Sequence, residues 1–412
     1  MVSDAIVTPA ADQGPRSPLM APCAPLVLGD ELARGAFGSV YVVDAPYEGQ
    51  VDASEAPRYG EARKIAVKRV PDPVGHVNRE LETCVRLARD PHPNVVRMLG
   101  YWTEEGAEGA GPTGPTGPKG PTAPTAPAVL YLAMEFFPET LGGVLARLAE
   151  SGMRMRTGRM TALAAQLARA LGHLERIGLM HRDVKPDNVL VDLHTNRLAL
   201  CDFGSAKFLG PAGPTSAGPT SAGAKFLGHA GPTSAGPTSA GVTYVCTRNY
   251  RAPELILGRD MYSTSVDVWA FGCILGEFAY GRPLFGGDTQ VDVLASIIRA
   301  RGMVTADDIA HMPTSQLEEI DSDSDVGLAG LSGLTALLGP TGLKALAGLS
   351  GPKPWSKVFT RRAGPLAPMR RVNASYGEFY ERVLDACLQW NPSSRTSAHD
   401  LCRDPAWGSL YP

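Results

Sequence analysis

The stretch HRDVKPDNVLVDLHTNRLALCDFG, residues 181–204, decides how this chain folds. Apolar residues alternate on both sides of a polar turn at 194–196, which predicts two short strands joined as a hairpin. Such a hairpin would bring Asp183 and Asn188 at one end close to Asp202 at the other. Carboxylate and amide oxygens are ligands that Mg²⁺ prefers, and they leave room for substrate phosphates. The stretch therefore indicates a magnesium and phosphate site.

The same stretch resembles the catalytic loop of protein kinases, H-R-D-x-K-P-x-x-N, followed by their D-F-G motif. Two linked motifs in the expected order arise by chance far less often than either one alone. The resemblance implies an α+β, bilobal protein-kinase fold, with an antiparallel-sheet N-lobe carrying one helix and a mainly helical C-lobe. It also implies ATP and Mg²⁺ as cofactors, with Asp183 and Lys185 as catalytic residues. Asn188 and Asp202 would be the metal ligands.

Length, charge and cysteine content restrict the domain number, the partners and the cellular location to be expected. A chain of 412 residues is long enough for two domains or one bilobal unit, and 44% apolar residues can supply a core. The net charge of −3 provides no basic field, so we expect neither nucleic acid nor a membrane as a partner. The seven cysteines include no C-x-x-C pair, and the N-terminal residues do not resemble a secretory signal. We therefore expect a cytoplasmic or nuclear monomer.

Composition also divides the chain. Residues 1–25 are rich in Pro and Ala and are expected to form a disordered tail. The kinase-like domain is expected over 26–410, with its N-lobe at 26–135 and its C-lobe at 138–410. Three segments with many Gly, Pro or repeated residues are expected to be disordered inserts, at 104–128, 208–241 and 315–352.

The second insert contains a tandem copy. Residues 206–223, AKFLGPAGPTSAGPTSAG, recur as 224–241, with only Pro211 replaced by His229. Two copies of a Gly, Pro, Ser and Thr sequence cannot bury enough surface to fold, so we expect a solvent-exposed loop. Lengthening a loop costs little, about 0.6 kcal/mol per doubling. The insert is therefore compatible with a folded kinase domain.

The N-terminal part of the domain carries a nucleotide-binding pattern. LARGAFGSVYVV, residues 32–43, predicts a strand, a glycine-bearing turn and a second strand, whose backbone N–H groups can approach phosphates. Ala33 stands where the kinase glycine loop has its first glycine. The following KIAVKRV resembles the V-A-I-K strand, with Lys68 as the phosphate-binding lysine. Glu80, on a predicted helix at 77–90, matches the glutamate that pairs with this lysine.

The resemblance implies a full set of ATP-contacting residues. Residues 129–141 predict a buried strand that enters the connector between the lobes, with Met134 at the rear pocket. The backbone of Glu135 and Phe137 would then bind the adenine edge, and a long helix at 161–177 would lead into the catalytic loop. The implied ATP site consists of Leu32, Ala33, Gly35, Ala36, Phe37, Gly38, Val40, Ala66, Lys68, Glu80, Met134, Glu135, Phe137 and Leu190.

Motifs further along the chain complete the kinase pattern. Residues 252–254 resemble the A-P-E motif that closes the activation segment, and an apolar helix is predicted soon after it. The resemblance implies that Asp267, near the start of this helix, holds the backbone of the catalytic loop. It also implies that Arg395 pairs with Glu254. Both roles are structural.

Shorter strings narrow the resemblance. CDFGSAK, VTYVCTRNYRAPEL, FFPETL, NRELE and KPWSKVF together are similar to glycogen synthase kinase-3, the shaggy-like serine/threonine kinases. That resemblance implies protein substrates that are already phosphorylated four residues C-terminal to the target. Arg79, Arg182 and Lys207 would bind the priming phosphate through charge-assisted hydrogen bonds. Lys225, in the repeated copy, is the alternative to Lys207.

The resemblance further implies autophosphorylation of Tyr244, with Arg248 and Arg251 holding its phosphate. The alternative for Tyr244 is a packed residue near the peptide groove. Because Thr243 and Tyr244 are adjacent, the Thr-x-Tyr site of mitogen-activated kinases is absent. The expected activity is transfer of the ATP γ-phosphoryl group to Ser or Thr hydroxyls. Two other functions stay open: a kinase-fold pseudokinase or scaffold, suggested by Ala33 and the inserts, and a proline-directed kinase that needs no priming.

Overall fold

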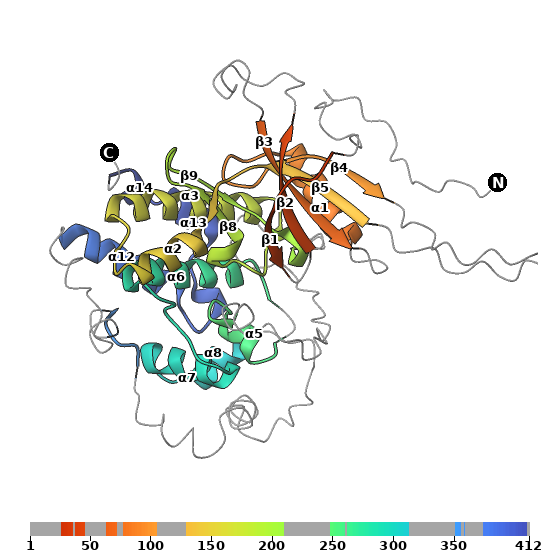
Figure 1. Cartoon of the computed structure of the whole chain (residues 1–412). Helices are drawn as coiled ribbons and strands as arrows, with labels where there is room; N and C mark the ends of the chain where they lie inside the picture. Colours follow the sequence, from red (N-terminus) through yellow and green to blue (C-terminus); the bar gives the residue numbers. More distant parts are fainter. Residues whose placement is uncertain are drawn as a thin grey trace, which may run out of the picture. The chain divides into compact units, whose positions relative to one another are not determined.

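The computed structural model describes residues 26–35, 38–45, 63–71, 77–104, 129–209, 248–259, 262–312, 351–355, 358 and 374–409. The chain divides into two compact units, shown as ribbons in Figure 1. The first unit comprises Met1–Pro91 and Arg97–Phe136, and the second comprises His92–Val96 and Phe137–Pro412.

In its described residues, the first unit is built on a five-stranded antiparallel sheet with one helix. Its strands follow the order β1-β2-β3-β5-β4. Their bounds are β1 Glu31–Gly35, β2 Gly38–Ala45, β3 Arg63–Pro71, β4 Met98–Glu104 and β5 Val129–Glu135, and the helix is α1 Val77–Arg89. This arrangement confirms the N-lobe architecture expected from the sequence.

Alternation along the strands gives this sheet two apolar faces. On one face Val67 and Ala133 pack with Trp102 and Tyr131, whose rings stack with centroids 4.8 Å apart. The other face is smaller and contains Cys84, Met98, Leu130 and Leu132. Cys84 belongs to α1, so this second cluster is where the helix packs on the sheet. Strand β3 is the central strand of the sheet and is hydrogen-bonded to β2 on one side and to β5 on the other. A functional side chain on β3 therefore starts from a backbone that is held on both sides.

The second unit is mainly helical. Its α-helices are α2 Leu141–Glu150, α3 Thr157–Arg176, α5 Pro253–Ile256, α6 Ser265–Tyr280, α7 Gln290–Arg301, α8 Ala306–Ala310, α12 Ala374–Cys387, α13 Ala398–Arg403 and α14 Ala406–Ser409. Its short strands are β6 Glu139–Thr140, β7 Leu179–Met180, β8 Val189–Asp192, β9 Arg197–Leu200 and β10 Lys207–Phe208. The 3₁₀ turns within the described residues are η1 Pro186–Asn188, η2 Phe203–Ser205 and η3 Pro392–Ser394.

Helix α6 forms the centre of this unit. All its residues from Val266 to Tyr280 are buried, and it packs against α3 and α12. A helix that is apolar on every side needs neighbours all around it. Two acidic residues, Asp267 and Glu277, are nevertheless buried within α6, so each requires a specific polar partner. None of the helices in the described residues is both long and apolar enough to cross a membrane.

Residues 92–96 belong to the second unit, which differs from the continuous N-lobe 26–135 expected from the sequence. Backbone hydrogen bonds explain the difference. Val96 N donates to Leu200 O and Leu200 N donates to Asn94 O, each at 2.9 Å. The Asn94 side chain also donates to Leu198 O at 2.9 Å. This short segment therefore extends the β8–β9 hairpin.

Helix α3 begins at Thr157, four residues before the predicted start, because residues 157–159 lack the apolar spacing by which a helix is recognised. The predicted tail 1–25 lies outside the described residues. So do the inserts, apart from their ends: Glu104 begins the first insert and ends β4, residues 208 and 209 begin the second, and residues 351 and 352 end the third.

Candidate active site

The predicted hairpin in the 181–204 stretch is present. Strands β8 and β9 pair antiparallel, with Val189 opposite Leu200. Asn196 in the connecting turn has φ 57°, a left-handed conformation that Asn tolerates better than most residues. Cys201 N donates to Asn188 O at 2.9 Å, so Asn188 and the neighbouring Asp202 lie on adjacent segments at one end of the hairpin.

Asp183 is the centre of a compact polar cluster. Its Oδ2 atom accepts from Lys185 Nζ at 2.7 Å and from Asn188 Nδ2 at 3.0 Å. Asn188 Nδ2 also donates to the Asp183 backbone carbonyl at 2.8 Å. The Lys185 and Asp183 side chains are only 17% and 15% exposed, so their attraction is weakly screened. Among the described residues no donor is hydrogen-bonded to Asp183 Oδ1.

Asp267 holds the backbone of the loop that carries Asp183. Its Oδ2 accepts from His181 N at 2.7 Å and its Oδ1 from Arg182 N at 2.8 Å. Burial raises the pKa of the Asp267 carboxyl, while the charges and hydrogen bonds of His181 and Arg182 act to lower it. Arg182 has φ 67°, a strained conformation for a residue with a side chain. The two hydrogen bonds predicted for Asp267 therefore also stabilise this strained residue.

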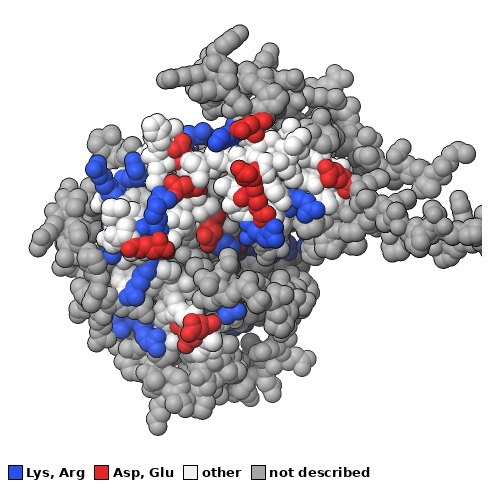
Figure 2. Space-filling view, in the orientation of Figure 1, with Lys and Arg blue, Asp and Glu red and all other residues white. Residues whose placement is uncertain are grey.

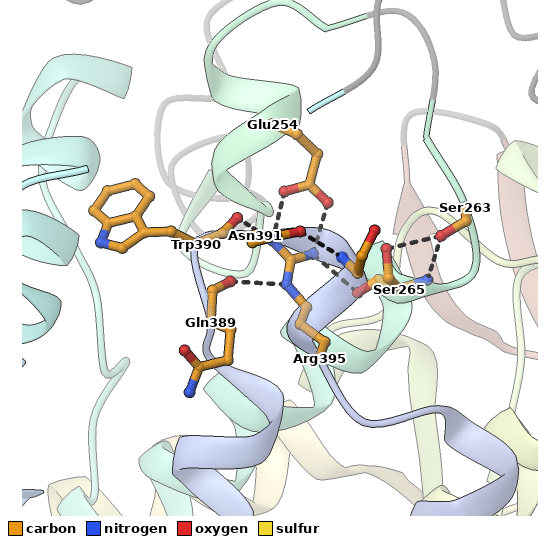
Figure 3. Close-up of polar contacts among 8 residues, drawn as sticks. Glu254, Ser263, Ser265, Gln389, Trp390, Asn391 and Arg395 are labelled. Atoms are coloured by element: carbon orange, nitrogen blue, oxygen red, sulfur yellow. Dashed lines mark hydrogen bonds and ion pairs between the residues drawn. The ribbon is translucent and has the colours of Figure 1, made fainter. Parts of the chain in front are cut away.

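The predicted pair of Glu254 and Arg395 is present and buried (Figure 3). Both of its N–O distances are 2.6 Å. The remaining N–H groups of Arg395 donate to three backbone carbonyls, of Gln389, Trp390 and Ser265. All five guanidinium N–H groups therefore have acceptors, which a buried arginine requires.

In the first unit, Lys68 on β3 and Glu80 in the first turn of α1 form the predicted ion pair. The distance from Lys68 Nζ to Glu80 Oε1 is 2.6 Å, and the side chains are 10% and 8% exposed. Lys68 lies opposite Val40 on β2 and Leu132 on β5. A lysine held in the middle of a sheet by a buried glutamate has a fixed position, which a phosphate-binding group needs.

The predicted glycine loop corresponds to the β1–β2 hairpin. Gly35 pairs with Gly38 at its end, and Ala36 and Phe37 lie outside the described residues. Gly38 has φ 137°, and a Cβ built on it would lie 2.1 Å from a backbone oxygen, so glycine is required there. Ala33 lies opposite Val40, directly after a register irregularity that begins at Glu31, and it has no positive φ. The methyl group of Ala33 therefore causes no backbone strain.

The other expected ATP-site residues divide between the units. Leu32, Val40 and Ala66 lie on β1, β2 and β3, and Met134 and Glu135 end β5. Glu135 N and Oε1 are both hydrogen-bonded to the Arg97 backbone, so the expected adenine contact of Glu135 would use its carbonyl oxygen. In the second unit, Leu190 lies on β8. Phe137 is buried, and the guanidinium carbon of Arg197 lies 5.3 Å from the centroid of the Phe137 ring.

Two of the three expected phosphate-binding residues lie on neighbouring segments of the second unit. Lys207 on β10 pairs with Met180, two residues before Arg182. Arg182 Nε donates to Ser205 O at 2.5 Å and its Nη1 to the Tyr262 hydroxyl at 2.9 Å. Arg79, the third residue, is exposed on α1 of the first unit. Lys225 lies outside the described residues.

The expected phosphotyrosine site is described only in part. Tyr244 lies outside the described residues. Arg248 Nη1 donates to Asp288 O at 3.2 Å, and Arg251 is half-buried before α5.

The contact between Arg182 and Tyr262 was not predicted, because no local pattern links residues so far apart in the sequence.

Sequence reasoning also missed a buried pair next to these residues. The Tyr250 hydroxyl donates to Glu277 Oε2 at 2.5 Å. Burial raises the pKa of Glu277 to about 7, partly offset by this hydrogen bond. A signal was available, since Glu277 is an acidic residue inside an otherwise apolar helix, and such a residue needs a partner.

The donor set fits a kinase-type divalent metal. Both Asn188 Nδ2 hydrogen bonds go to Asp183, which leaves the Oδ1 atom of Asn188 as a hard oxygen ligand. Asp202 supplies a carboxylate from the adjacent segment, where its φ of 63° marks a turn. In the described part of the chain no three His, Cys, Asp or Glu side chains gather as a metal site. Mg²⁺ is usually bound by only one or two protein carboxylates, and phosphate oxygens of the substrate supply further ligands. A kinase-type metal site therefore does not need three such side chains.

Comparison with known proteins agrees with this geometry. A family model for the protein kinase domain matches residues 26–407. The chain is also 33% identical over 248 residues to Protein kinase gsk31 of Schizosaccharomyces pombe. That alignment covers 60% of this chain and 53% of the relative, so it spans about half of the relative's length. The kinase resemblance of the 181–204 stretch is thereby confirmed, and the chain belongs to the protein kinase domain family.

Proposed function

We propose that this chain is a serine/threonine protein kinase that transfers the γ-phosphoryl group of ATP to protein substrates. The observation that carries the proposal is the Asp183 carboxylate, held at one oxygen by Lys185 and Asn188. Membership of the kinase family implies ATP and a divalent metal in general terms. The choice of Mg²⁺ is part of the proposal, supported by the hard oxygens of Asn188 and Asp202.

The residues of this chain would act as follows. Asp183 orients the substrate hydroxyl and accepts its proton at Oδ1, while Lys185 stabilises the negative charge of the phosphoryl group in transit. Lys68, fixed by Glu80, binds the α- and β-phosphates. Mg²⁺, when bound by Asn188 and Asp202, would supply charge neutralisation for the phosphate oxygens.

An Asp183→Asn variant tests the proposed activity. The amide cannot accept the proton, so phosphoryl transfer to a Ser/Thr peptide should fall by about 10²- to 10⁴-fold while binding of a fluorescent ATP analogue persists. The matched control is Asp307→Asn, whose side chain is 83% exposed on α8, and this variant should keep wild-type activity. Equal transfer by the Asp183→Asn and wild-type proteins would contradict the assignment. So would a wild-type protein that binds ATP but transfers nothing.

We further propose a preference for primed substrates through Arg79, Arg182 and Lys207. What supports it is the available donor capacity: Arg79 is exposed, and Arg182 uses Nε and Nη1 while Nη2 has no acceptor among the described residues. A guanidinium fork bonded to phosphate contributes about 1.5–3 kcal/mol, less where solvent reaches it.

The test compares one peptide with and without a phosphoserine four residues C-terminal to the target. The ratio of kcat/KM for the primed to the unprimed peptide should fall about 10-fold in Arg79→Ala. Arg89→Ala, an exposed arginine on the same helix, should leave the ratio unchanged. A wild-type ratio near one would favour an unprimed kinase, even if the Asp183→Asn result supports catalysis.

Autophosphorylation of Tyr244 is the third part of the proposal. It rests on the similarity of the surrounding string and on the two arginines, Arg248 and Arg251, that follow Tyr244. Mass spectrometry of the purified wild-type protein should find phosphate on Tyr244. The Asp183→Asn protein from the same host is the control, because phosphate there would come from another kinase.

A further inference from the structure

The second unit contains a cavity lined by none of the predicted site residues. Its volume is about 420 Å³, and it lies between α2, the loop that follows α2, the start of α3 and the turn after β8. Half of its lining residues are arginines and no lining residue is acidic. The arginines are Arg147, Arg154, Arg156 and Arg159. We call this the arginine pocket.

Most of this charge is not neutralised. Arg147 forms an ion pair with Glu139, which raises the pKa of Arg147. Arg156 and Arg159 are exposed and have no acidic partner among the described residues. Figure 2 shows Lys and Arg side chains, with Asp and Glu side chains among them, over the part of the second unit where Figure 1 has α2. Uncompensated guanidinium groups around a hollow attract anions and concentrate them there.

Arg154 is held in place by a different contact. Its guanidinium lies over Gly281, the C-cap of α6, where a Cβ would approach Nη1 to 2.2 Å. The C-terminal end of a helix favours a cation, so part of the Arg154 charge is balanced there. Arg156 and Arg159 are therefore the two groups best able to bind a ligand.

The start of α3 adds to the positive potential of the arginines. Arg156 is the N-cap of this 20-residue helix and makes no side-chain capping hydrogen bond. The first N–H groups of a helix have no partners within it, and the helix dipole places partial positive charge there. Arg156 and Arg159 belong to this end of α3, so the partial positive charge of the helix adds to theirs.

The rest of the lining is apolar. Leu148, Met155 and Leu193 are half-buried, and Val144 is buried beneath them. A small inorganic anion would use the arginines alone and leave these side chains without a role. A membrane surface would need several protruding apolar side chains, whereas these lining residues are half-buried or buried and, in the loop between α2 and α3, Met153 is the exposed apolar side chain. The combination fits a peptide that brings acidic groups and an apolar side chain together.

We propose that the arginine pocket is a docking site for an acidic segment of a partner protein. One apolar side chain of the segment occupies the cavity over Leu148 and Met155, and flanking carboxylates bind Arg156 and Arg159. Carboxylates match the planar guanidinium fork, and charge complementarity selects acidic over neutral or basic segments. This docking is independent of the proposed phosphoryl transfer, since it uses none of the same residues.

The test measures binding of a fluorescein-labelled peptide with the core Glu-Asp-Leu-Asp-Glu to the full chain by fluorescence anisotropy. Loss of two charged contacts should weaken binding at least about 10-fold in Arg156→Glu/Arg159→Glu. Arg169→Glu, an exposed arginine further along α3, is the matched control and should bind like wild type. Replacing Leu by Ser in the peptide should also weaken binding, because the cavity is then unfilled.

Several outcomes would overturn the docking proposal. They are equal binding by the double variant, equal binding of the Ser peptide, no binding at all, and displacement of the peptide by inorganic phosphate at similar concentration. Binding to anionic vesicles that is lost in the double variant while peptide binding persists would point to a membrane instead. If charge reversal lowers the melting temperature, Arg156→Gln/Arg159→Gln replaces it with the same expected loss of peptide binding.

Discussion

Glu254 and Arg395, separated by 141 residues, meet in a bidentate ion pair whose side chains are 1% and 0% exposed. The pair joins α5, which begins within the A-P-E motif, to the turn before α13. Arg395 also lies over the Trp269 ring of α6, with its guanidinium carbon 5.1 Å from the centroid. Three parts of the second unit thus meet at one guanidinium.

Removing one partner of this pair should be costly. Arg395→Met leaves the Glu254 charge buried without compensation, so the free energy of unfolding should fall by about 3–5 kcal/mol. The double variant Glu254→Gln/Arg395→Met should lose less than Arg395→Met alone, because no charge remains unpaired. Urea unfolding measures both, with Arg403→Met, exposed on α13, as the control. A double variant that is less stable than the single one would contradict this explanation.

The Lys68–Glu80 pair should matter for ATP use. Glu80→Gln keeps the side-chain shape but loses the charge that holds Lys68, so kcat/KM for ATP should fall about 10- to 100-fold. Steady-state kinetics with varied ATP measure the effect. Glu82→Gln, on the exposed face of the same helix, should behave as wild type. A wild-type kcat/KM in Glu80→Gln would show that Lys68 does not depend on its partner.

Asp267 should influence turnover without touching substrate. In Asp267→Asn one carboxylate acceptor becomes an amide NH₂ facing a backbone N–H, and the loss of one buried hydrogen bond should cost about 1–3 kcal/mol of stability. Because Arg182 is strained and precedes Asp183, kcat should fall while the KM for ATP stays near its wild-type value. Unfolding and kinetic measurements on the same preparation separate the two effects. A stability loss with unchanged kcat would limit Asp267 to a structural role.

Glu277 should make stability depend on pH. Burial raises its pKa from 4.5 to about 7, so between these values the folded protein binds more protons at this site than the unfolded chain. The contribution of Glu277 to stability is therefore complete below pH 4.5 and is lost as pH rises through about 7. Glu277→Gln does not titrate, so its stability relative to wild type should increase over this range by up to about 3 kcal/mol.

Urea unfolding at a series of pH values measures this difference. Tyr250→Phe removes the hydrogen bond that lowers the pKa of Glu277, so in this variant the loss of stability should move to higher pH. The control is Glu82→Gln, which should reproduce the wild-type pH profile. Parallel profiles for wild type and Glu277→Gln would mean that the carboxyl is charged throughout the range.

The sequence was enough to predict a structural feature where that feature depends on neighbouring residues or belongs to a known motif. The 189–200 hairpin follows from alternation around a turn, and α1 follows from its apolar spacing. The partners of Lys68 and Asp267 came from the order of kinase motifs. Each of these features depends on one short stretch of sequence or on two stretches that are known to pair in kinases.

Other features depend on the packed structure. The two-residue strands β7 and β10 exist because Met180 and Lys207 meet across the fold, and neither has a strand signal of its own. The Tyr250–Glu277 hydrogen bond joins separate segments in the same way. The arginine pocket gathers side chains from α2, a loop and α3 that share no periodic pattern. Tertiary contacts of this kind override local propensity.

The position of residues 92–96 in the second unit has a consequence for folding. The chain passes between the units three times, after Pro91, after Val96 and after Phe136, so no single cut releases the second unit complete. A fragment that begins at Phe137 would leave both backbone groups of Leu200 without the partners they have in the whole chain. Asn94 and Leu198 are 104 residues apart, so this pairing forms only after the whole first unit and the β8–β9 hairpin of the second have been synthesised. Contacts between residues so far apart require the closure of a long loop, and this one makes the helical unit depend on a segment that interrupts the chain of the sheet.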